Sequence, residues 1–391
     1  MSRCLFPTVL LAVGCHLALP LEEAPDFGAK VPDQGSSEAS VDTSAPREGS
    51  PDGQGDQQTG TPWWNAGYAH RLPLLITEKA AGPLPAGYSV VLVLDTAALV
   101  ATQKLQQSGD DLRLVRWDGA AHHEHHRRLV APDTKTTEVW FKTEGAINGE
   151  SRDYTLYHGN PGAGAPPDHW SDSMGADTPS EVYVAADDFE EHAAGDCPDG
   201  WAPCDTGVSS QRWQVQGTSE RFLQTTADDT YIFSGQTHWA DISMEARVWS
   251  EHPDGCPGIA SRVQTQKHLV YAGYNCIDSK AQYPPIFGKD NVTVWVRPDA
   301  DGYYPLHDAQ DLGVTINPQE WHRVRVAWTG AEVRLFHDGI FAGKASTKTP
   351  DVVGAGRVGL FSTYGNLPFR ADDVVVRLYV DPEPVVSVAQ P

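Results

Sequence analysis

The sequence contains only three methionines and no hydrophobic run long enough to cross a membrane. A membrane-spanning helix needs about 20 consecutive apolar residues. Basic residues are also scarce, because 29 Lys and Arg stand against 52 Asp and Glu, giving a formal net charge of −23 without any block of basic residues. Nucleic acids and anionic lipid headgroups both attract basic surfaces. The composition therefore argues against both as direct partners.

A sustained helical period is missing as well. The chain instead has 36 glycines, 29 prolines and 12 tryptophans, a composition that favours turn-rich β structure over a helical bundle. Its 391 residues are too many for one small sandwich and predict two domains plus terminal segments. The predicted fold class is all-β, with two β-sandwich domains after a disordered N-terminal tether.

The first 19 residues are typical of a secretory signal peptide. Met1-Ser2-Arg3 is short and positive, and residues 5–19 are mostly apolar. The run Leu11-Ala12-Val13-Gly14-Cys15 resembles a bacterial lipobox, whose cysteine becomes lipidated, although Leu is commoner than Ala at the position of Ala12. The segment allows two alternatives for the mature protein. It is either a lipoprotein anchored through Cys15 at the cell envelope or outer-membrane surface, or an ordinary secreted protein that is cleaved slightly later.

Residues 20–61 are dominated by Pro, Gly, Ser, Asp, Glu, Gln and Thr. So few large apolar residues cannot offset the conformational entropy lost on folding, and we expect a disordered linker here. Behind a lipidated cysteine, such a linker would be a tether. A plain disordered terminus would have the same composition.

Four cysteines remain after the signal segment, in agreement with an oxidising compartment. Four cysteines allow three pairings, and their order favours two local disulfides, which are Cys197–Cys204 and Cys256–Cys276. A zinc site is the competing interpretation, but the spacings fit no common zinc pattern.

Residues 62–165 are predicted to form the first sandwich. Short apolar or alternating segments are separated by turn residues at intervals typical of such a fold. The predicted strands are residues 71–76, 89–94, 112–117, 138–142 and 154–157. The order of these segments, and above all the end Tyr157-His158-Gly159-Asn160-Pro161, resembles the bacterial domain-of-unknown-function family 2341. Members are typically found on exported proteins in front of concanavalin-A-like modules, and the family brings no established chemistry.

Residues 166–180 form a connector, and residues 181–380 form the second predicted sandwich, followed by a tail at 381–391. Its strands alternate clearly, with Ile242, Met244, Ala246 and Val248 on one face. The sequence His337-Asp338-Gly339 is a strong signal for a tight hairpin. About 200 such residues suit a large jelly roll.

This module resembles the concanavalin-A-like lectin/glucanase superfamily, which includes laminin-G-like jelly rolls. Three degenerate signatures carry the resemblance by their order, and they are Asp187-Asp188-Phe189 before Trp201, residues 320–326 before Asp338-Gly339, and residues 356–360 before residues 371–376. The resemblance implies a two-sheet jelly roll. It also implies ligands on the concave sheet or rim loops, which are polysaccharides or proteins, and in some relatives glycan hydrolysis.

No catalytic motif accompanies that resemblance. Glycan hydrolysis usually needs two carboxylates about 5–10 Å apart, and glucanase relatives carry theirs as Glu-x-Asp-x-x-Glu on one strand. The second module lacks that pattern, and the chain shows neither a Gly-x-Ser-x-Gly motif nor a phosphate-binding glycine loop. The run His122-His123-Glu124-His125-His126 could bind a transition metal, but Arg127 and Arg128 beside it favour an exposed edge without one.

Calcium is the cofactor that the resemblance raises, because related modules often hold a structural calcium near their chain ends. Asp188 and Asp373 could supply its oxygens across adjacent strands. The alternative is that both acids cap turns or face water.

Aromatic residues outside the inward rows are the candidates for ligand contact, since sugar rings stack on Trp and Tyr while charged groups bind hydroxyls. The predicted set is Arg262, Tyr274, Trp295, Tyr303 and Tyr364. The competing interpretation is that these residues only pack the sandwich.

Together these patterns predict an exported, surface-anchored, non-catalytic protein that binds a polysaccharide or surface glycan. The alternatives are a glycoside-hydrolase-like enzyme and a structural or adhesive module that binds protein. Membrane contact is expected only through the lipid anchor.

Overall fold

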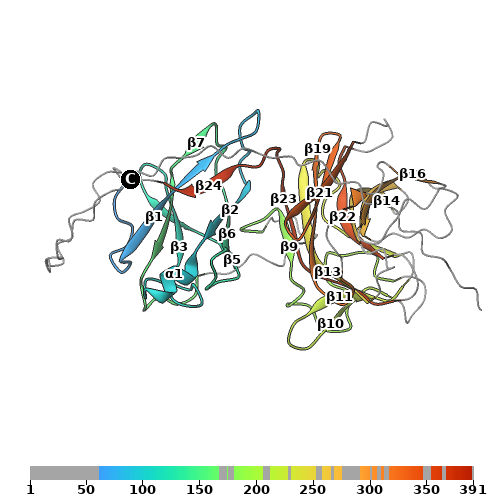
Figure 1. Cartoon of the computed structure of the whole chain (residues 1–391), viewed down its shortest axis with the longest axis horizontal. Coiled ribbons are helices and arrows are strands. Elements are labelled where there is room, and N and C mark those ends of the chain that lie inside the picture. Colours follow the sequence, from blue (N-terminus) through green and yellow to red (C-terminus); the bar gives the residue numbers. More distant parts are fainter. Residues whose placement is uncertain are drawn as a thin grey trace, which may run out of the picture. The chain divides into compact units, whose positions relative to one another are not determined.

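The computed structural model describes residues 61–166, 174, 180–205, 212–227, 230–251, 258–265, 268–274, 291–299, 302–305, 310–311, 317–346, 354–362 and 367–389. Within them, only the backbone is described for residues 268–269, 271–274, 291–299, 302–305, 310–311 and 345–346. This part of the chain consists almost entirely of β-strands that build two sandwiches (Figure 1), so the predicted all-β class is confirmed. No helix among the described residues is long and apolar enough to cross a membrane.

The first sandwich has a six-stranded and a three-stranded sheet. The larger sheet has the order β24-β1-β8-β3-β4, with β7 also paired to β1. Its strands are β1 (His70–Thr77), β3 (Arg113–Trp117), β4 (His122–His125), β7 (Glu150–Ser151), β8 (Tyr154–His158) and β24 (Val385–Val388). The smaller sheet has the order β2-β6-β5, formed by β2 (Ser89–Leu94), β6 (Thr137–Lys142) and β5 (Arg128–Val130).

The only described helix, α1 (Thr96–Ala101), follows β2 directly. Asp95 caps it, because its side chain accepts a hydrogen bond from the backbone N–H of Ala98. The core between the two sheets is formed by alternate residues of the predicted strands, such as Leu74, Val90 and Leu156. The predicted strands of this module therefore exist and face the interior as expected.

The C-terminal strand β24 departs from the predicted tail. It lies antiparallel to β1, with Leu74 opposite Val388 and Thr77 opposite Val385. Val386 packs against the core of the first sandwich, together with Leu378 and Val380. Residues 385–388 are thus an edge strand of the first sandwich, added after the chain has completed the second one. Such a partner cannot be seen in a local sequence window.

The second sandwich has an eight-stranded and a seven-stranded sheet. The eight-stranded sheet has the order β10-β11-β23-β13-β19-β20-β21, with β9 also beside β23. Its strands are β9 (Ala185–Asp187), β10 (Gln214–Gln216), β11 (Phe222–Thr225), β13 (Ile242–Ser250), β19 (His322–Thr329), β20 (Glu332–His337), β21 (Ile340–Ser346) and β23 (Phe369–Leu378).

The seven-stranded sheet has the order β12-β22-β14-β15-β16-β17, with β18 beside β16. Its strands are β12 (Thr230–Ser234), β14 (Gly258–Thr265), β15 (His268–Tyr274), β16 (Asn291–Asp299), β17 (Gly302–Pro305), β18 (Gln310–Asp311) and β22 (Arg357–Ser362). Because the chain crosses repeatedly between the two sheets, the module has the predicted jelly-roll character.

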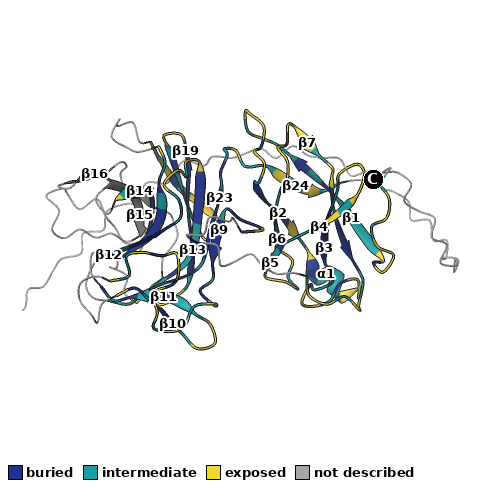
Figure 2. Cartoon of the chain, turned by 180° about the vertical axis from the view of Figure 1, so that it is seen from behind, coloured by how far each residue is buried: buried dark blue, intermediate teal, exposed yellow. Residues whose placement is uncertain are grey.

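The alternation of apolar and polar residues in β13 predicts which face of the eight-stranded sheet is buried. Ile242, Met244, Ala246 and Val248 of β13 are all buried in the core of the second sandwich. Figure 2 shows the buried strands of both sandwiches in dark blue. The opposite face of the same sheet carries Arg247, Arg323, Arg325 and Arg377. The contacts of these arginines are described in the next subsection.

Candidate functional site

A disulfide joins Cys197 to Cys204, as the sequence predicts, with Cα atoms 5.8 Å apart. It closes the loop that contains Trp201, whose indole N–H donates to the Asp187 carboxylate at 2.8 Å. Cys256, Cys276 and the proposed lipidation site Cys15 lie outside the described residues.

The predicted ligand-contact residues fall mainly in the seven-stranded sheet. Tyr274 ends β15, Trp295 lies in β16 and Tyr303 lies in β17, which are neighbouring strands. The register places Tyr271, rather than Tyr274, opposite Trp295. Tyr364 lies outside the described residues. The strands are therefore adjacent, and ligand contact by these three tyrosines and Trp295 stays a prediction.

Arg262 lies on a central strand of the seven-stranded sheet, as the sequence suggested. It occupies an irregular point in β14, where the register shifts between Ala260 and Val263, and its φ is +51°. Its guanidinium carbon lies 4.8 Å from the ring centre of the buried Trp328, and its Nη2 donates to the Gly330 carbonyl. Arg262 is only 3% exposed, so it stabilises the sandwich and offers no surface to a ligand.

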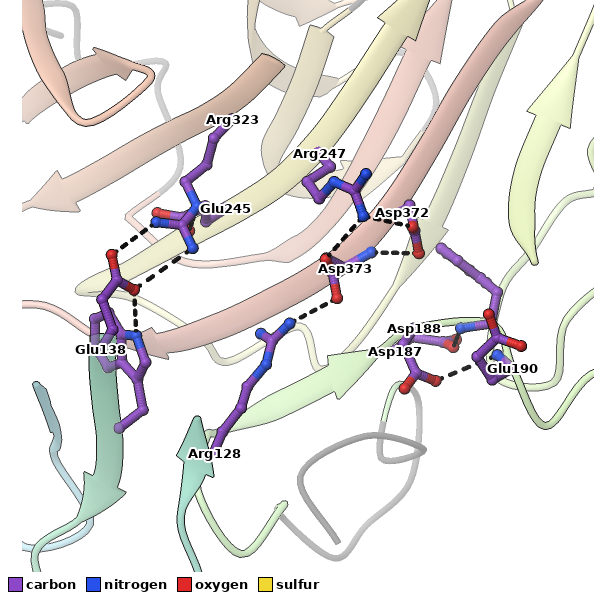
Figure 3. Close-up of polar contacts among 12 residues, drawn as sticks. Arg128, Glu138, Asp187, Asp188, Glu190, Glu245, Arg247, Arg323, Asp372 and Asp373 are labelled. Atoms are coloured by element: carbon purple, nitrogen blue, oxygen red, sulfur yellow. Dashed lines mark hydrogen bonds and ion pairs between the residues drawn. The ribbon is translucent and has the colours of Figure 1, made fainter. Parts of the chain in front are cut away.

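The predicted calcium ligands flank the pairing of β9 with β23. Asp187 lies opposite Val374, Asp188 directly follows β9, and Asp373 directly precedes Val374 in β23. The two oxygens of Asp373 are already paired, Oδ1 with Arg128 at 2.6 Å and Oδ2 with Arg247 at 3.3 Å (Figure 3). Two guanidinium groups thus supply the positive charge here, and calcium at Asp188 and Asp373 stays a prediction.

Asp372 shares Arg247 but is more deeply buried. Its Oδ2 lies 3.2 Å from Arg247 Nη1, and its side chain is 5% exposed. Burial, followed by the neighbouring Asp373 charge, raises the pKa of Asp372 to about 7. Burial also raises the pKa of the Asp188 carboxyl.

The histidine run of the first sandwich lies on the edge strand β4, and two of its histidines contact carboxylates. His122–His125 form β4, in which His123 contacts Asp118 at 2.8 Å and His125 lies 3.3 Å from Glu144. In the described part of the chain, only His322, His337 and Asp338 bring three ligand groups together.

Among the described residues, a cavity of about 280 Å³ is a candidate binding site. One wall comes from β2 and β6 of the first sandwich, and the other from β13, β19, β20 and β23 of the second. Its lining is Tyr88, Ser89, Val90, Val91, Glu138, Trp140, Glu245, Arg323, Arg325, Phe336, Gly339, Arg377, Glu383 and Pro384. Both walls lie within the compact unit that residues 58–391 form.

Arg323 is the central cation of this cavity. Its Nη1 donates to Glu138 Oε1 at 3.0 Å, and its Nε lies 3.0 Å from Glu245 Oε1. Figure 3 shows Arg323 reaching both carboxylates, one from each sandwich. Glu138 also accepts a hydrogen bond from the indole of Trp140 at 2.8 Å, which fixes the orientation of that ring.

Glu383, Arg325 and Arg377 form a second group of charged side chains in the cavity lining. Glu383 contacts Arg377 and also accepts a hydrogen bond from Arg325 Nη1 at 2.8 Å. Burial alone would raise the pKa of Glu383, but the two guanidiniums lower it to about 2. Arg377 in turn lies over the ring of Trp140, with its guanidinium carbon 5.0 Å from the ring centre.

The three arginines and three glutamates therefore balance in charge, while Tyr88, Trp140 and Phe336 add aromatic surface. Sequence reasoning missed this site because it requires both sandwiches. The available signal is the pair Arg323 and Arg325 on the outward face of β19. Considered without the first sandwich, such a strand is typical of an ordinary solvent-exposed surface.

No protein-family model and no curated protein matches the sequence. The resemblance of the first module to domain-of-unknown-function family 2341 thus stays a prediction.

Solved structures do match part of the chain. A CBM66 carbohydrate-binding module of Bacillus subtilis is 15% identical, covers 46% of this chain and 95% of its own, and gives a TM-score of 0.34. The mixed-linkage glucan GH16 protein of Bacteroides ovatus is 11% identical, with 49% and 98% covered and a TM-score of 0.35. Porphyranase B of Zobellia galactanivorans is 13% identical, with 49% and 91% covered and a TM-score of 0.33. At these scores the assignment of the second sandwich rests on its own sheets.

Proposed function

We propose that this protein is a non-catalytic carbohydrate-binding protein that holds a neutral sugar in the cavity between β6 and β19. The observation that carries the proposal is the lining, in which aromatic rings stand beside arginine and glutamate side chains of balanced charge. Sugar rings pack their C–H faces on aromatic groups, and their hydroxyls both donate and accept hydrogen bonds.

The charged groups are held in place before any ligand arrives. Arg323 is fixed by Glu138 and Glu245, and Arg325 by Glu383. Groups that are already oriented lose little conformational freedom on binding, which favours affinity. A net-neutral lining also matches an uncharged polyhydroxylated ligand better than a phosphate or a polyanion.

The same contacts favour binding over hydrolysis. A glycosidase needs one carboxyl that carries a proton, and enzymes obtain it by placing that group in an apolar environment. Glu138 and Glu245 instead both contact the guanidinium of Arg323. We therefore expect bound glycans to stay intact.

A glycan array probed with the full chain tests the proposal. We expect specific binding that Trp140→Ala weakens at least tenfold. Glu245→Gln is the milder second variant, because it keeps the side-chain volume while removing the charge. Binding without any product release would separate recognition from hydrolysis.

Trp249→Ala is the matched control. Trp249 also lies on the eight-stranded sheet, with the guanidinium carbon of Arg370 4.1 Å from its ring centre, but it does not line the cavity. Equal losses in the two tryptophan variants, or no glycan binding by the folded chain, would overturn the proposal and favour a protein-binding, adhesive role.

We further propose that the chain is exported and anchored through a lipid on Cys15. The support is the run of residues 11–15 followed by the polar segment 20–61. In a bacterial host, Cys15→Ser should abolish incorporation of labelled fatty acid, and Cys4→Ser, in the same segment, should not. Labelling that survives Cys15→Ser would contradict the anchor.

A further inference from the structure

A second cluster of ligand groups lies at the β19–β20 hairpin, and its three side chains do not line the proposed sugar cavity. His322 begins β19, His337 ends β20, and Asp338 opens the turn to β21. Val324 pairs with His337, so the two histidines are diagonal neighbours on the inner side of the sheet. Their ring centres are 4.9 Å apart.

The surroundings of His322 leave one of its nitrogens facing an anion. Nε2 lies 3.0 Å from the Asn317 carbonyl oxygen, which can only accept, so Nε2 carries the hydrogen and donates. Nδ1 then faces Asp338 Oδ2 at 3.0 Å. In a neutral imidazole this nitrogen is an acceptor, and two acceptors at that distance need a cation or a proton between them.

Asp338 is held equally firmly. The backbone N–H of Arg323 donates to Asp338 Oδ1 at 2.7 Å, and the backbone N–H of Asp338 donates to the Arg323 carbonyl at 2.7 Å. Oδ2 is thereby turned toward the histidines, where it also lies 3.5 Å from His337 Nδ1. The three ligand atoms all lie within 4.8 Å of one another.

We propose that His322, His337 and Asp338 form a zinc-binding site. Two imidazoles and one carboxylate are a ligand set that zinc accepts in tetrahedral geometry, with a fourth position left for water. The hydrogen bond that His322 donates to the Asn317 carbonyl and the one that the Arg323 N–H donates to Asp338 are the outer contacts that orient such ligands. Calcium is a poor fit because it prefers oxygen ligands only.

Burial and access are both suitable. The histidine side chains are 11% and 4% exposed, whereas that of Asp338 is 45% exposed, which gives an ion a route from solvent. A bound ion would tie the start of β19 to the turn after β20. The site would therefore act as a clamp on this hairpin.

Zinc titration of the chelator-treated full chain, followed by calorimetry, tests this site. We expect one tight equivalent per chain, and we expect its affinity to fall by at least about 100-fold in His322→Gln and Asp338→Asn, because removing even an outer contact of a metal ligand costs up to that much. Asp338→Asn should still fold, because Asn-Gly is a preferred pair for this turn, in which Asp338 has a φ of +46° and Gly339 of +79°.

The control is the double variant His123→Gln/His125→Gln, which disrupts the other histidine-rich segment and should leave the tight equivalent unchanged. Cobalt should give the visible absorption of a tetrahedral complex in the unaltered chain and in this control. Unchanged zinc affinity in Asp338→Asn and His322→Gln, or no tight zinc binding by the unaltered chain, would overturn the proposal.

Discussion

At the scale of single residues, burial decides which charged groups behave unusually. Asp372 has its side chain almost completely out of water, beside a second carboxylate and a single shared guanidinium. Arg247, which also contacts Asp373, does not fully offset the cost of removing the Asp372 carboxylate from water, and the pKa of Asp372 therefore rises to about 7.

This pKa predicts a pH dependence of stability. An unfolded Asp has a pKa near 3.9, so between about pH 4 and pH 7 the folded chain binds more protons than the unfolded one, and Asp372 lowers the free energy of unfolding as the pH rises. Asp372→Asn should remove that loss and gain up to about 4 kcal/mol over the unaltered chain above pH 7, with no gain below pH 4. Urea unfolding at a series of pH values measures it.

Glu191→Gln is the control for that experiment, because Glu191 is exposed in the same module. Its unfolding profile should run parallel to that of the unaltered chain. A profile for Asp372→Asn that is also parallel would show that the Asp372 carboxyl titrates as it does in the unfolded chain.

Single residues also show where sequence reasoning ends. Alternation placed Ile242 and Met244 in the core correctly, because side-chain direction in a strand follows from its period of two. The face of Arg262 could not be assigned in this way: β14 is irregular at this residue, its side chain packs over Trp328, and nothing in the local sequence marks the irregularity.

At the scale of elements, β24 is the strand whose role was unexpected. It covers the edge of β1 and contributes Val386 to the core of the first sandwich, whereas Val385 is 50% exposed. Two neighbouring valines on one short strand thus have opposite environments, which provides a test of the strand assignment.

Val386→Asp should destabilise the first sandwich, because an unpaired carboxylate would enter an apolar core, at a cost of about 2–3 kcal/mol. Val385→Asp, on the exposed side, should change the free energy of unfolding by less than about 0.5 kcal/mol. Hydrogen exchange of the β1 amides reports the local effect, and it should accelerate only in Val386→Asp. Equal effects of the two variants would contradict the pairing of β24 with β1.

At the scale of the whole molecule, the sequence indicated two sandwiches but not the way in which they share a surface. Val182, Tyr183, Ala186 and Val375 form a small apolar cluster with Trp140. Around it, Arg323 of the second module contacts Glu138 of the first. Each strand alone presents these charges as an ordinary solvated row, so only the folded pair reveals that acid and base face each other.

Because β24 is the last strand of the chain, its pairing with β1 has a consequence for folding during synthesis. β1 is made about 300 residues before the strand that completes its sheet. During that interval the edge of β1 is a row of unpaired N–H and C=O groups, which is the feature that invites pairing with other chains. A chain that stops short of residue 385 would keep that edge open however well its second sandwich had folded. The first sandwich can therefore be completed only after the whole second sandwich has been synthesised.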